Sequence, residues 1–229
     1  MKFKESDMYE PIRNLLTQQG FTVRGEVKGC DIAAVRDDIL WVVEMKLSAN
    51  ITLIYQAMSR QTATDWVFIA IPRPRKARDS AFLKLQKLVK KLELGLITVA
   101  LDSPGKFAEI IIFPVGKDDK NNKKTKAVKR EIAGRSVDST GGTTKIKINT
   151  AYKERCVKIA CLLEAKGPLS AKTLTGLGCE KDAWHILNTN VWFSKVSKGV
   201  YGLSEVGELY LKENAAESLV AYYRMKSNA

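Results

Sequence analysis

The chain has 229 residues, which is enough for one large domain or for two smaller domains with their own cores. Its 38 basic and 25 acidic residues give a formal net charge of +13, which favours a polyanionic partner, either nucleic acid or an anionic membrane surface. No apolar run approaches the roughly 20 residues that span a bilayer, and the polar start, MKFKESDMYE, lacks the apolar core of a secretion signal. We therefore expect a cytoplasmic protein without a membrane partner.

The four cysteines and the single histidine do not have the spacing of a zinc module. Cys30, Cys156, Cys161 and Cys179 form no Cys-x-x-Cys pair, and His185 stands alone. We expect these cysteines to be free thiols in a reducing compartment. A metal ion bound by this chain would therefore be held by oxygen ligands.

The first 115 residues alternate between helix and strand patterns. Gly20 ends the first helix pattern, and Asp79 is a suitable cap for the third. Predicted helices cover 4–19, 51–65 and 79–94, and predicted strands cover 21–27, 30–36, 39–46, 66–72, 95–101 and 107–114. This alternation predicts an α/β fold in which helices cover both faces of a mixed sheet.

The composition changes near Val115. Residues 116–148 contain few apolar residues, two adjacent glycines and a cluster of lysines. This composition is typical of a solvated basic linker between a first domain, residues 1–115, and a second domain, residues 149–229. It would also suit a tail that becomes ordered on nucleic acid.

The second domain combines helices with a compact hairpin. Predicted helices cover 151–167, 168–178, 179–192 and 205–226, with Ser170 as the cap of the second, and the hairpin covers 193–204 with its turn at 197–199. This order is typical of a winged helix-turn-helix, which reads DNA with its third helix and its wing. A winged helix can also serve as a protein-interaction module.

Two carboxylates face each other in the hairpin predicted for residues 30–46. Counting outward from a turn at 37–38 puts Asp31 directly opposite Glu44. Like charges at opposed positions destabilise a sheet unless a cation lies between them, and carboxylate oxygens suit magnesium. Lys46 lies on the same face as Glu44, because side chains alternate along a strand. It could orient or deprotonate a water, or offset charge on a phosphate.

Two further polar residues lie on helices next to this hairpin. Glu5 falls on the apolar stripe of the first helix, where a buried carboxylate needs a partner such as the metal cluster. Gln56 and Arg60 are one turn apart on the second helix, and both could reach a phosphate.

The hairpin carries Asp31 and, after twelve intervening residues, the run Glu44-Met45-Lys46. This arrangement resembles the signature of the PD-(D/E)XK nuclease superfamily, which has a restriction-endonuclease-like fold. The ESDxYxPI opening, the spacing of CD and ExK, and the trailing winged helix are most similar to a bacterial phosphodiesterase family of unassigned role in that superfamily. The resemblance implies that Asp31, Glu44 and the Met45 carbonyl bind Mg²⁺, for which Mn²⁺ can substitute. It also implies that Lys46 activates the water, with Glu5 and Gln56 as accessory catalytic residues. Cys30 stands at the proline position of the superfamily name.

Three other interpretations of these residues stay open. Asp31 could cap a strand edge while Glu44 and Lys46 form a surface ion pair, although the run LWVVEM is too apolar for an ordinary exposed strand. The fold could also have lost its activity and act only in binding. RNA is another candidate substrate, but the aromatic platforms of common RNA modules are not visible.

Two basic regions are candidates for contact with nucleic acid. The loop RPRKAR follows a predicted strand, and loops at strand ends often form the rim of an active-site cleft. Its cationic side chains could either contact phosphates or increase solubility. In the second domain, Trp184 forms a stripe with Leu187 and Val191, which predicts that it packs in the core. The candidate residues are Arg60, Arg73, Arg75, Lys76 and Arg78 in the first domain, and Lys181, His185, Asn188, Lys195 and Lys198 in the second.

These observations together predict a magnesium-dependent phosphodiesterase that hydrolyses DNA. The alternative is a DNA-binding regulator without catalytic activity, built on a nuclease-like fold. Cutting both strands of a duplex would be easier for a homodimer, and the sequence leaves the oligomeric state open.

Overall fold

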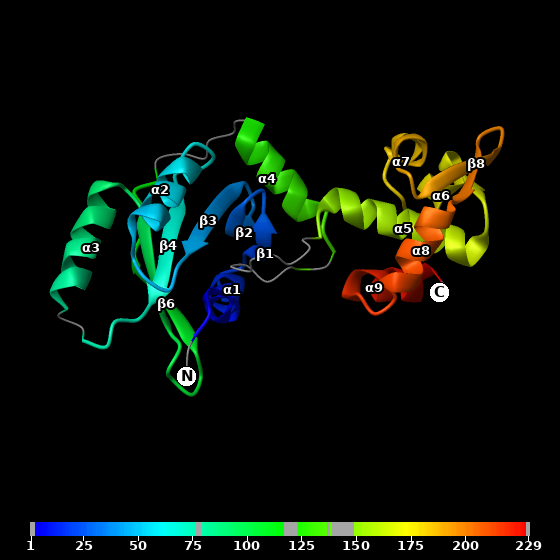
Figure 1. Cartoon of the computed structure of the whole chain (residues 1–229). Coiled ribbons are helices and arrows are strands. Elements are labelled where there is room, and N and C mark those ends of the chain that lie inside the picture. Colours follow the sequence, from blue (N-terminus) through cyan, green and yellow to red (C-terminus); the bar gives the residue numbers. More distant parts are fainter. Residues whose placement is uncertain (1–2, 77–78, 117–122, 137, 139–148, 228–229) are drawn as a thin grey trace. The chain divides into compact units, whose positions relative to one another are not determined.

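The computed structural model describes residues 3–76, 79–116, 123–136, 138 and 149–227, and these form two compact units (Figure 1). The first unit contains the described residues up to Gly134 together with Asp138. The second contains Arg135, Ser136 and residues 149–227.

The first unit is built on a six-stranded mixed sheet with the order β1-β2-β3-β4-β5-β6. Neighbouring strands are antiparallel except for the parallel pairs β3–β4 and β4–β5. The strands are β1 (Thr22–Val27), β2 (Cys30–Arg36), β3 (Ile39–Met45), β4 (Val67–Pro72), β5 (Gly95–Ala100) and β6 (Phe107–Ile112). This mixed sheet fits the nuclease-like α/β class that the sequence predicts.

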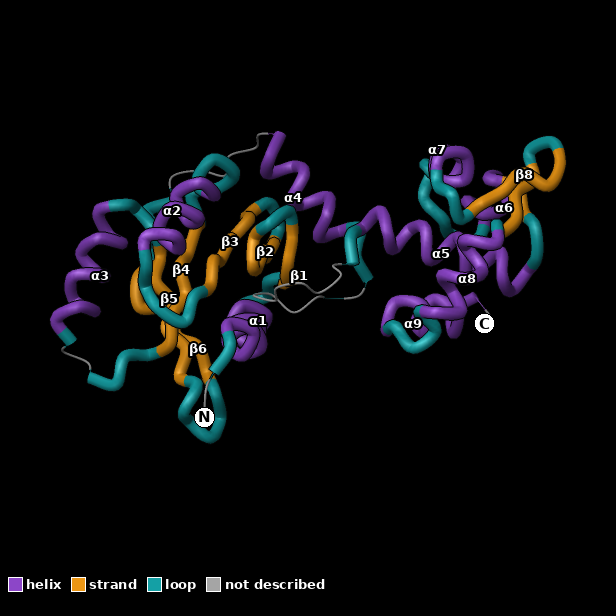
Figure 2. Tube along the Cα trace, in the orientation of Figure 1, coloured by secondary structure: helices purple, strands orange, loops and turns teal. Residues whose placement is uncertain are grey.

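Helices cover both faces of this sheet (Figure 2). On one face, Ile12 and Leu16 pack in a core with Val43 and Phe68 of the central strands. The helices of the first unit are η1 (Glu5–Met8), α1 (Tyr9–Gln18), α2 (Ile51–Arg60), α3 (Ser80–Lys91) and α4 (Lys123–Ala133). Helices α2, α3 and α4 contribute to the core on the other face. Because both faces are covered, β3, β4 and β5 are almost continuously apolar.

Helix α4 differs from the basic linker that the sequence predicts for residues 116–148. Val128 and Ile132 lie one turn apart on α4 and are buried in the core of the first unit. The hydroxyl group of the buried Thr125 donates a hydrogen bond to the Ala63 carbonyl. These three buried residues pack α4 against the first unit, although the many lysines around them give the segment the composition of a solvent-exposed linker. Residues 117–122 and 139–148 lie outside the described part of the chain.

The second unit packs its helices around a small antiparallel sheet with the order β7-β9-β8. Its elements are α5 (Ala151–Lys166), β7 (Leu169–Ser170), α6 (Ala171–Gly176), α7 (Ala183–Thr189), β8 (Phe193–Ser197), β9 (Val200–Leu203), α8 (Glu205–Glu213) and α9 (Ser218–Ser227). The Ser170 side chain caps α6 by accepting a hydrogen bond from the Thr173 amide, as predicted. The final helical stretch is divided into α8 and α9, whereas the sequence predicts one helix.

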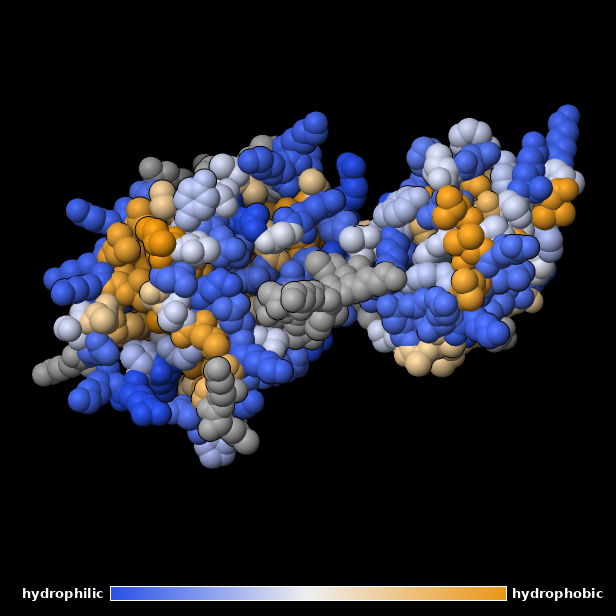
Figure 3. All heavy atoms as spheres, viewed as in Figure 1, coloured by the Kyte–Doolittle hydropathy of each residue, from blue (hydrophilic) through white to orange (hydrophobic). Residues whose placement is uncertain are grey.

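The four cysteines are free, as the sequence predicts, and all four are buried. Within the described residues, no helix is long and apolar enough to cross a membrane. Hydrophilic residues predominate on the face shown in Figure 3, with smaller hydrophobic patches on both units.

Candidate active site

The β2–β3 hairpin brings Asp31 and the end of β3 together. The strands pair in the predicted register, from Arg36 opposite Ile39 to Ile32 opposite Val43. This register continues to Asp31, whose Oδ2 accepts a hydrogen bond of 2.7 Å from the Met45 amide. The predicted meeting of the two acidic residues therefore follows from a tight turn and strand pairing alone.

Glu44 is a fully buried carboxylate in this site, with an exposed fraction of 0%. Among the described residues, its Oε2 has no hydrogen-bond partner. Burial raises the pKa of Glu44 to about 7, and the negative charge of Asp31 adds to the increase while Arg60 opposes it. The pKa of Asp31 is also raised by burial, against the opposing effect of the Met45 amide. The pair therefore favours an added proton or cation.

Arg60 binds Glu44, whereas the sequence suggests that it contacts a phosphate. Its Nε donates a hydrogen bond of 2.6 Å to Glu44 Oε1, and its Nη2 donates a second to the Gly29 carbonyl. Gly29 has a φ of +79°, and a Cβ added there would lie 3.5 Å from Arg60 Nη2. The turn between β1 and β2 thus holds the guanidinium against Glu44.

Lys46 forms an ion pair with Glu5, since Lys46 Nζ lies 2.9 Å from Glu5 Oε2. Burial acts to lower the pKa of Lys46, but the hydrogen bond and charge of Glu5 raise it above its ordinary value. Lys46 is therefore cationic at neutral pH. The sequence predicts Glu5 beside a metal ion, whereas the structure places its carboxylate on the lysine.

Gln56 is half-buried on α2, one turn before Arg60. Its Oε1 is buried and has no hydrogen-bond partner among the described residues. Helix α2, which carries Gln56, packs against β3 and β4. The role of Gln56 toward a substrate stays a prediction.

Asp31 and Glu44 could together hold a divalent metal ion. Both supply carboxylate oxygens, and within the described part of the chain the buried Oε2 of Glu44 has no hydrogen-bond partner. No group of three or more His, Cys, Asp or Glu side chains suited to a metal ion occurs within the described residues. Magnesium is often bound by one or two carboxylates and keeps several waters, so two carboxylates are sufficient. The Met45 carbonyl stays a predicted ligand.

The candidate cationic residues that follow β4 differ in their contacts and exposure. Arg73 forms an ion pair with Glu109 and lies over the Phe107 ring at 4.8 Å, so it is bound to β6. Arg75 and Lys76 are exposed. Arg78 lies outside the described residues.

The candidates in the second unit lie around α7 and the β8–β9 hairpin. Asn188 is bound internally, since its Nδ2 donates to the Trp184 carbonyl at 2.6 Å and its Oδ1 accepts from Tyr201 at 3.1 Å. Asn188 is nevertheless exposed, as are Lys181 just before α7, His185 on α7, and Lys195 and Lys198 on the hairpin.

The prediction that Trp184 packs in the core is wrong. Trp184 is 62% exposed and Val191 is 70% exposed, whereas Leu187 is buried. Helix α7 ends at Thr189, so Val191 does not continue the helical stripe, and Ala183, Ile186 and Leu187 form the buried face. The exposed tryptophan is thus a candidate contact residue that the periodicity did not reveal.

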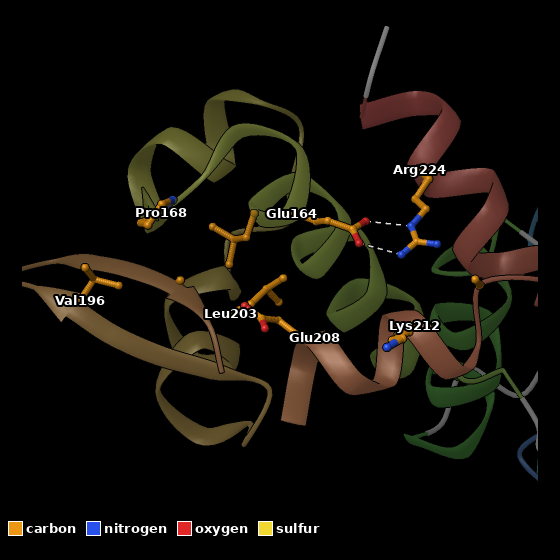
Figure 4. A pocket seen from close by; sticks show the side chains of 10 residues that line it. Glu164, Pro168, Val196, Leu203, Glu208, Lys212 and Arg224 are labelled. Carbon is orange, nitrogen blue, oxygen red and sulfur yellow. Dashed lines mark hydrogen bonds and ion pairs between the residues drawn. The ribbon is translucent and has the colours of Figure 1, made fainter. Parts of the chain in front are cut away.

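The second unit also contains a pocket of about 600 Å³ (Figure 4). Pro168, Val196 and Leu203 line one part of it, and an ion pair between Glu164 and Arg224 lines another. The guanidinium donates two hydrogen bonds, of 2.8 and 2.6 Å, to the Glu164 carboxylate. The charge of this carboxylate is therefore compensated within the unit.

A mixed sheet with Asp31 on β2 and Glu44-Met45-Lys46 at the end of β3 resembles the PD-(D/E)XK superfamily. Residues 97–209 match the model of a family described as "Putative PD-(D/E)XK phosphodiesterase (DUF2161)". The match covers just under half of the chain, from β5 to α8, and supports this resemblance. Asp31, Glu44 and Lys46 precede the matched residues. No curated protein and no solved structure gave a match.

Proposed function

We propose that this protein is a Mg²⁺-dependent phosphodiesterase that hydrolyses DNA. The observation that carries the proposal is the buried Glu44, which lies next to Asp31 and is followed two residues later by Lys46. No described residue provides a hydrogen bond to Glu44 Oε2. A buried carboxylate pair without a bound cation is destabilising, whereas a metal between the two offsets the repulsion. The family match supports a nuclease-like activity.

In this proposal Asp31 and Glu44 hold the metal ion, with Mn²⁺ as a substitute for Mg²⁺. When bound, the ion polarises the scissile phosphate and lowers the pKa of a bound water. Lys46 is cationic beside Glu5, so it donates hydrogen bonds to the attacking water or to a phosphate oxygen and offsets the growing negative charge. Glu5 positions Lys46, and Gln56 orients the substrate.

The second unit is proposed to be a winged helix-turn-helix that binds DNA. Its order of a long helix, a short strand, two short helices and a hairpin supports this assignment. Lys181 and His185 at α7, with Lys195 and Lys198 on the hairpin, would contact phosphates. The net charge of +13 would make the affinity fall steeply with added salt. Cutting both strands would be easier for a homodimer.

The test is cleavage of labelled linear and circular duplexes, single strands, flaps, branched junctions and RNA. Each substrate is incubated with magnesium, manganese or a chelator, and with wild-type, Glu44→Ala or Lys46→Ala protein purified in the same way. We expect metal-dependent cleavage of DNA that both variants lose. Cleavage that persists equally in both variants, or cleavage of RNA alone, would contradict the proposal.

A second candidate function is DNA binding without catalysis. The ion pair between Arg60 and Glu44 favours it, because a guanidinium on Oε1 partly takes over the neutralising role of a metal ion. This candidate predicts salt-sensitive DNA binding, no cleavage of any substrate, and unchanged affinity in Lys46→Ala.

A further inference from the structure

A pocket of about 470 Å³ lies between the C-terminal end of α2, the β1–β2 turn and helix α4. Lys28, Arg60 and Lys124 are its cationic lining residues, and Ser59 and Thr62 add hydroxyl groups. None of the described residues that line the pocket is a carboxylate. The volume is in the usual range for small-ligand sites, and the lining favours an anion.

This pocket shares one wall with the candidate active site. The Arg60 side chain lines the pocket, while its Nε holds Glu44 Oε1 at 2.6 Å. Cys30, which also lines the pocket, directly precedes Asp31 on β2. A bound group in the pocket would therefore be a near neighbour of a phosphate at the carboxylate pair.

Helix α4 forms one wall of the pocket and is held in place by its buried residues. Thr125 and Val128 are buried in the first unit, on either side of the exposed Ala127, which lines the pocket. Lys124 Nζ donates a hydrogen bond of 3.1 Å to Thr62 Oγ1, which links α4 to the segment after α2. The backbone of Lys124 is thus already held in place by a packed helix, so it need not become ordered when an anion binds.

Lys28 and Lys124 add positive charge to the pocket beside that of Arg60. Arg60 is held by Glu44, and its charge is already compensated. Lys28 Nζ lies 3.9 Å from Glu131 Oε2, at the limit of an ion pair, and its side chain is more than half exposed. A pair with this geometry is weak, so Lys28 can still attract a second anion.

We infer that this pocket binds a phosphodiester group of the nucleic-acid strand, next to the phosphate that is cut. The inference rests on the proposed function, because the carboxylate pair supplies the position of the scissile phosphate. The basic segment before the second unit then contributes directly to substrate binding through α4. The same phosphate chemistry could come from a free mononucleotide, so the experiment includes both sources.

The test measures binding of a labelled DNA duplex by fluorescence anisotropy, in chelator and over a range of salt concentrations. All proteins are full-length and carry Lys46→Ala, so that no substrate is cut. Lys124→Ala is compared with Lys126→Ala, which removes an exposed lysine of α4 that does not line the pocket. Ala127→Trp, which fills the pocket without changing charge, is compared with Ala133→Trp near the other end of the helix.

We expect Lys124→Ala to weaken DNA binding about five- to tenfold and to lower the slope of log affinity against log salt by about 1. Ala127→Trp should weaken binding to a similar extent, and both controls should stay within about twofold of the parent protein. Equal effects of Lys124→Ala and Lys126→Ala, or wild-type affinity in Ala127→Trp, would overturn the inference and leave the proposed function standing.

Two further outcomes concern the source of the phosphate and the proposed function itself. A deoxynucleoside monophosphate that binds in a Lys124-dependent way, while duplex binding is unaffected by Lys124→Ala, would overturn the assignment to the substrate strand. Absence of nucleic-acid binding by the parent protein would contradict the proposed function, and the inference with it.

Discussion

Arg60 Nε lies 2.6 Å from Glu44 Oε1, while the other oxygen of this carboxylate is buried without a hydrogen-bond partner among the described residues. Oε1 of Glu44 is thus bound by a cationic group of the protein, and the charge of Asp31 adds to the rise in the pKa of Glu44 that burial causes. Arg60 opposes the effect of burial on the pKa of Glu44 and orients the carboxylate, which leaves Oε2 as the atom for a cation.

Replacing Arg60 should destabilise the metal-free protein in a pH-dependent way. Arg60→Leu leaves Glu44 as an unpaired buried charge, which we expect to cost about 3 kcal/mol of unfolding free energy at pH 8. Because Arg60 lowers the pKa of Glu44, the variant should bind a proton on Glu44 more readily, and the loss should be smaller at pH 5. Urea unfolding in chelator measures both values. A loss of equal size at the two pH values would contradict this role of Arg60.

Glu44 itself should make stability depend on pH. Its pKa rises from 4.5 to about 7 on folding, so its contribution to stability is fully present below about pH 4.5 and is lost as the pH rises through 7. This shift corresponds to at most roughly 3 kcal/mol. In chelator, Glu44→Gln should therefore unfold at a higher temperature than wild-type at pH 8 and at a similar temperature at pH 4.5. A variant that is less stable than wild-type at pH 8 would show that burial of this carboxylate carries no such cost.

Glu5 should affect turnover through Lys46 rather than substrate binding. Glu5→Gln removes the charge that holds Lys46 Nζ, and we expect kcat to fall between about tenfold and a hundredfold with KM unchanged. Glu10→Gln is the matched control, because Glu10 is exposed and bound only to the surface residue Arg13 among the described contacts. Single-turnover cleavage separates the two effects. A rise in KM without a change in kcat would instead place Glu5 in contact with the substrate.

Trp184 should matter for binding and not for stability. Because its side chain is 62% exposed, Trp184→Ala should leave the melting temperature nearly unchanged and weaken DNA affinity. Leu187→Ala on the same helix is the comparison, since Leu187 is buried and its truncation should cost about 3 kcal/mol. Thermal unfolding and anisotropy measurements on the same samples test both statements. If Trp184→Ala leaves the affinity unchanged, this face of α7 does not contact DNA.

The hairpin register was accessible from the sequence, because a two-residue turn and strict alternation leave one arrangement. The pairing of Ile32 with Val43 confirms it. The ion pair between Arg60 and Glu44 was not accessible, since it depends on where α2 packs against β3. Periodicity fixes which residues share a helix face, but it does not fix what that face meets in space.

Helix α4 was missed for a different reason. Its average composition is strongly basic, and only Val128 and Ile132, one turn apart, mark the buried face. The low apolar content of the whole segment hides the helical spacing of these two buried residues. The opposite error affects Trp184. Its predicted burial depends on an apolar stripe that reaches Val191, but the helix ends at Thr189.

We propose that a divalent cation binds between Asp31 and Glu44, which the β2–β3 pairing brings together. Titration calorimetry with Mn²⁺ on the metal-free full-length protein tests it most directly, in wild-type, Asp31→Asn, Glu44→Gln and Lys46→Ala. We predict one site in wild-type that is lost in both carboxylate variants and kept in Lys46→Ala. Binding that is unchanged in Asp31→Asn and Glu44→Gln, or absent from the wild-type protein, would contradict the claim.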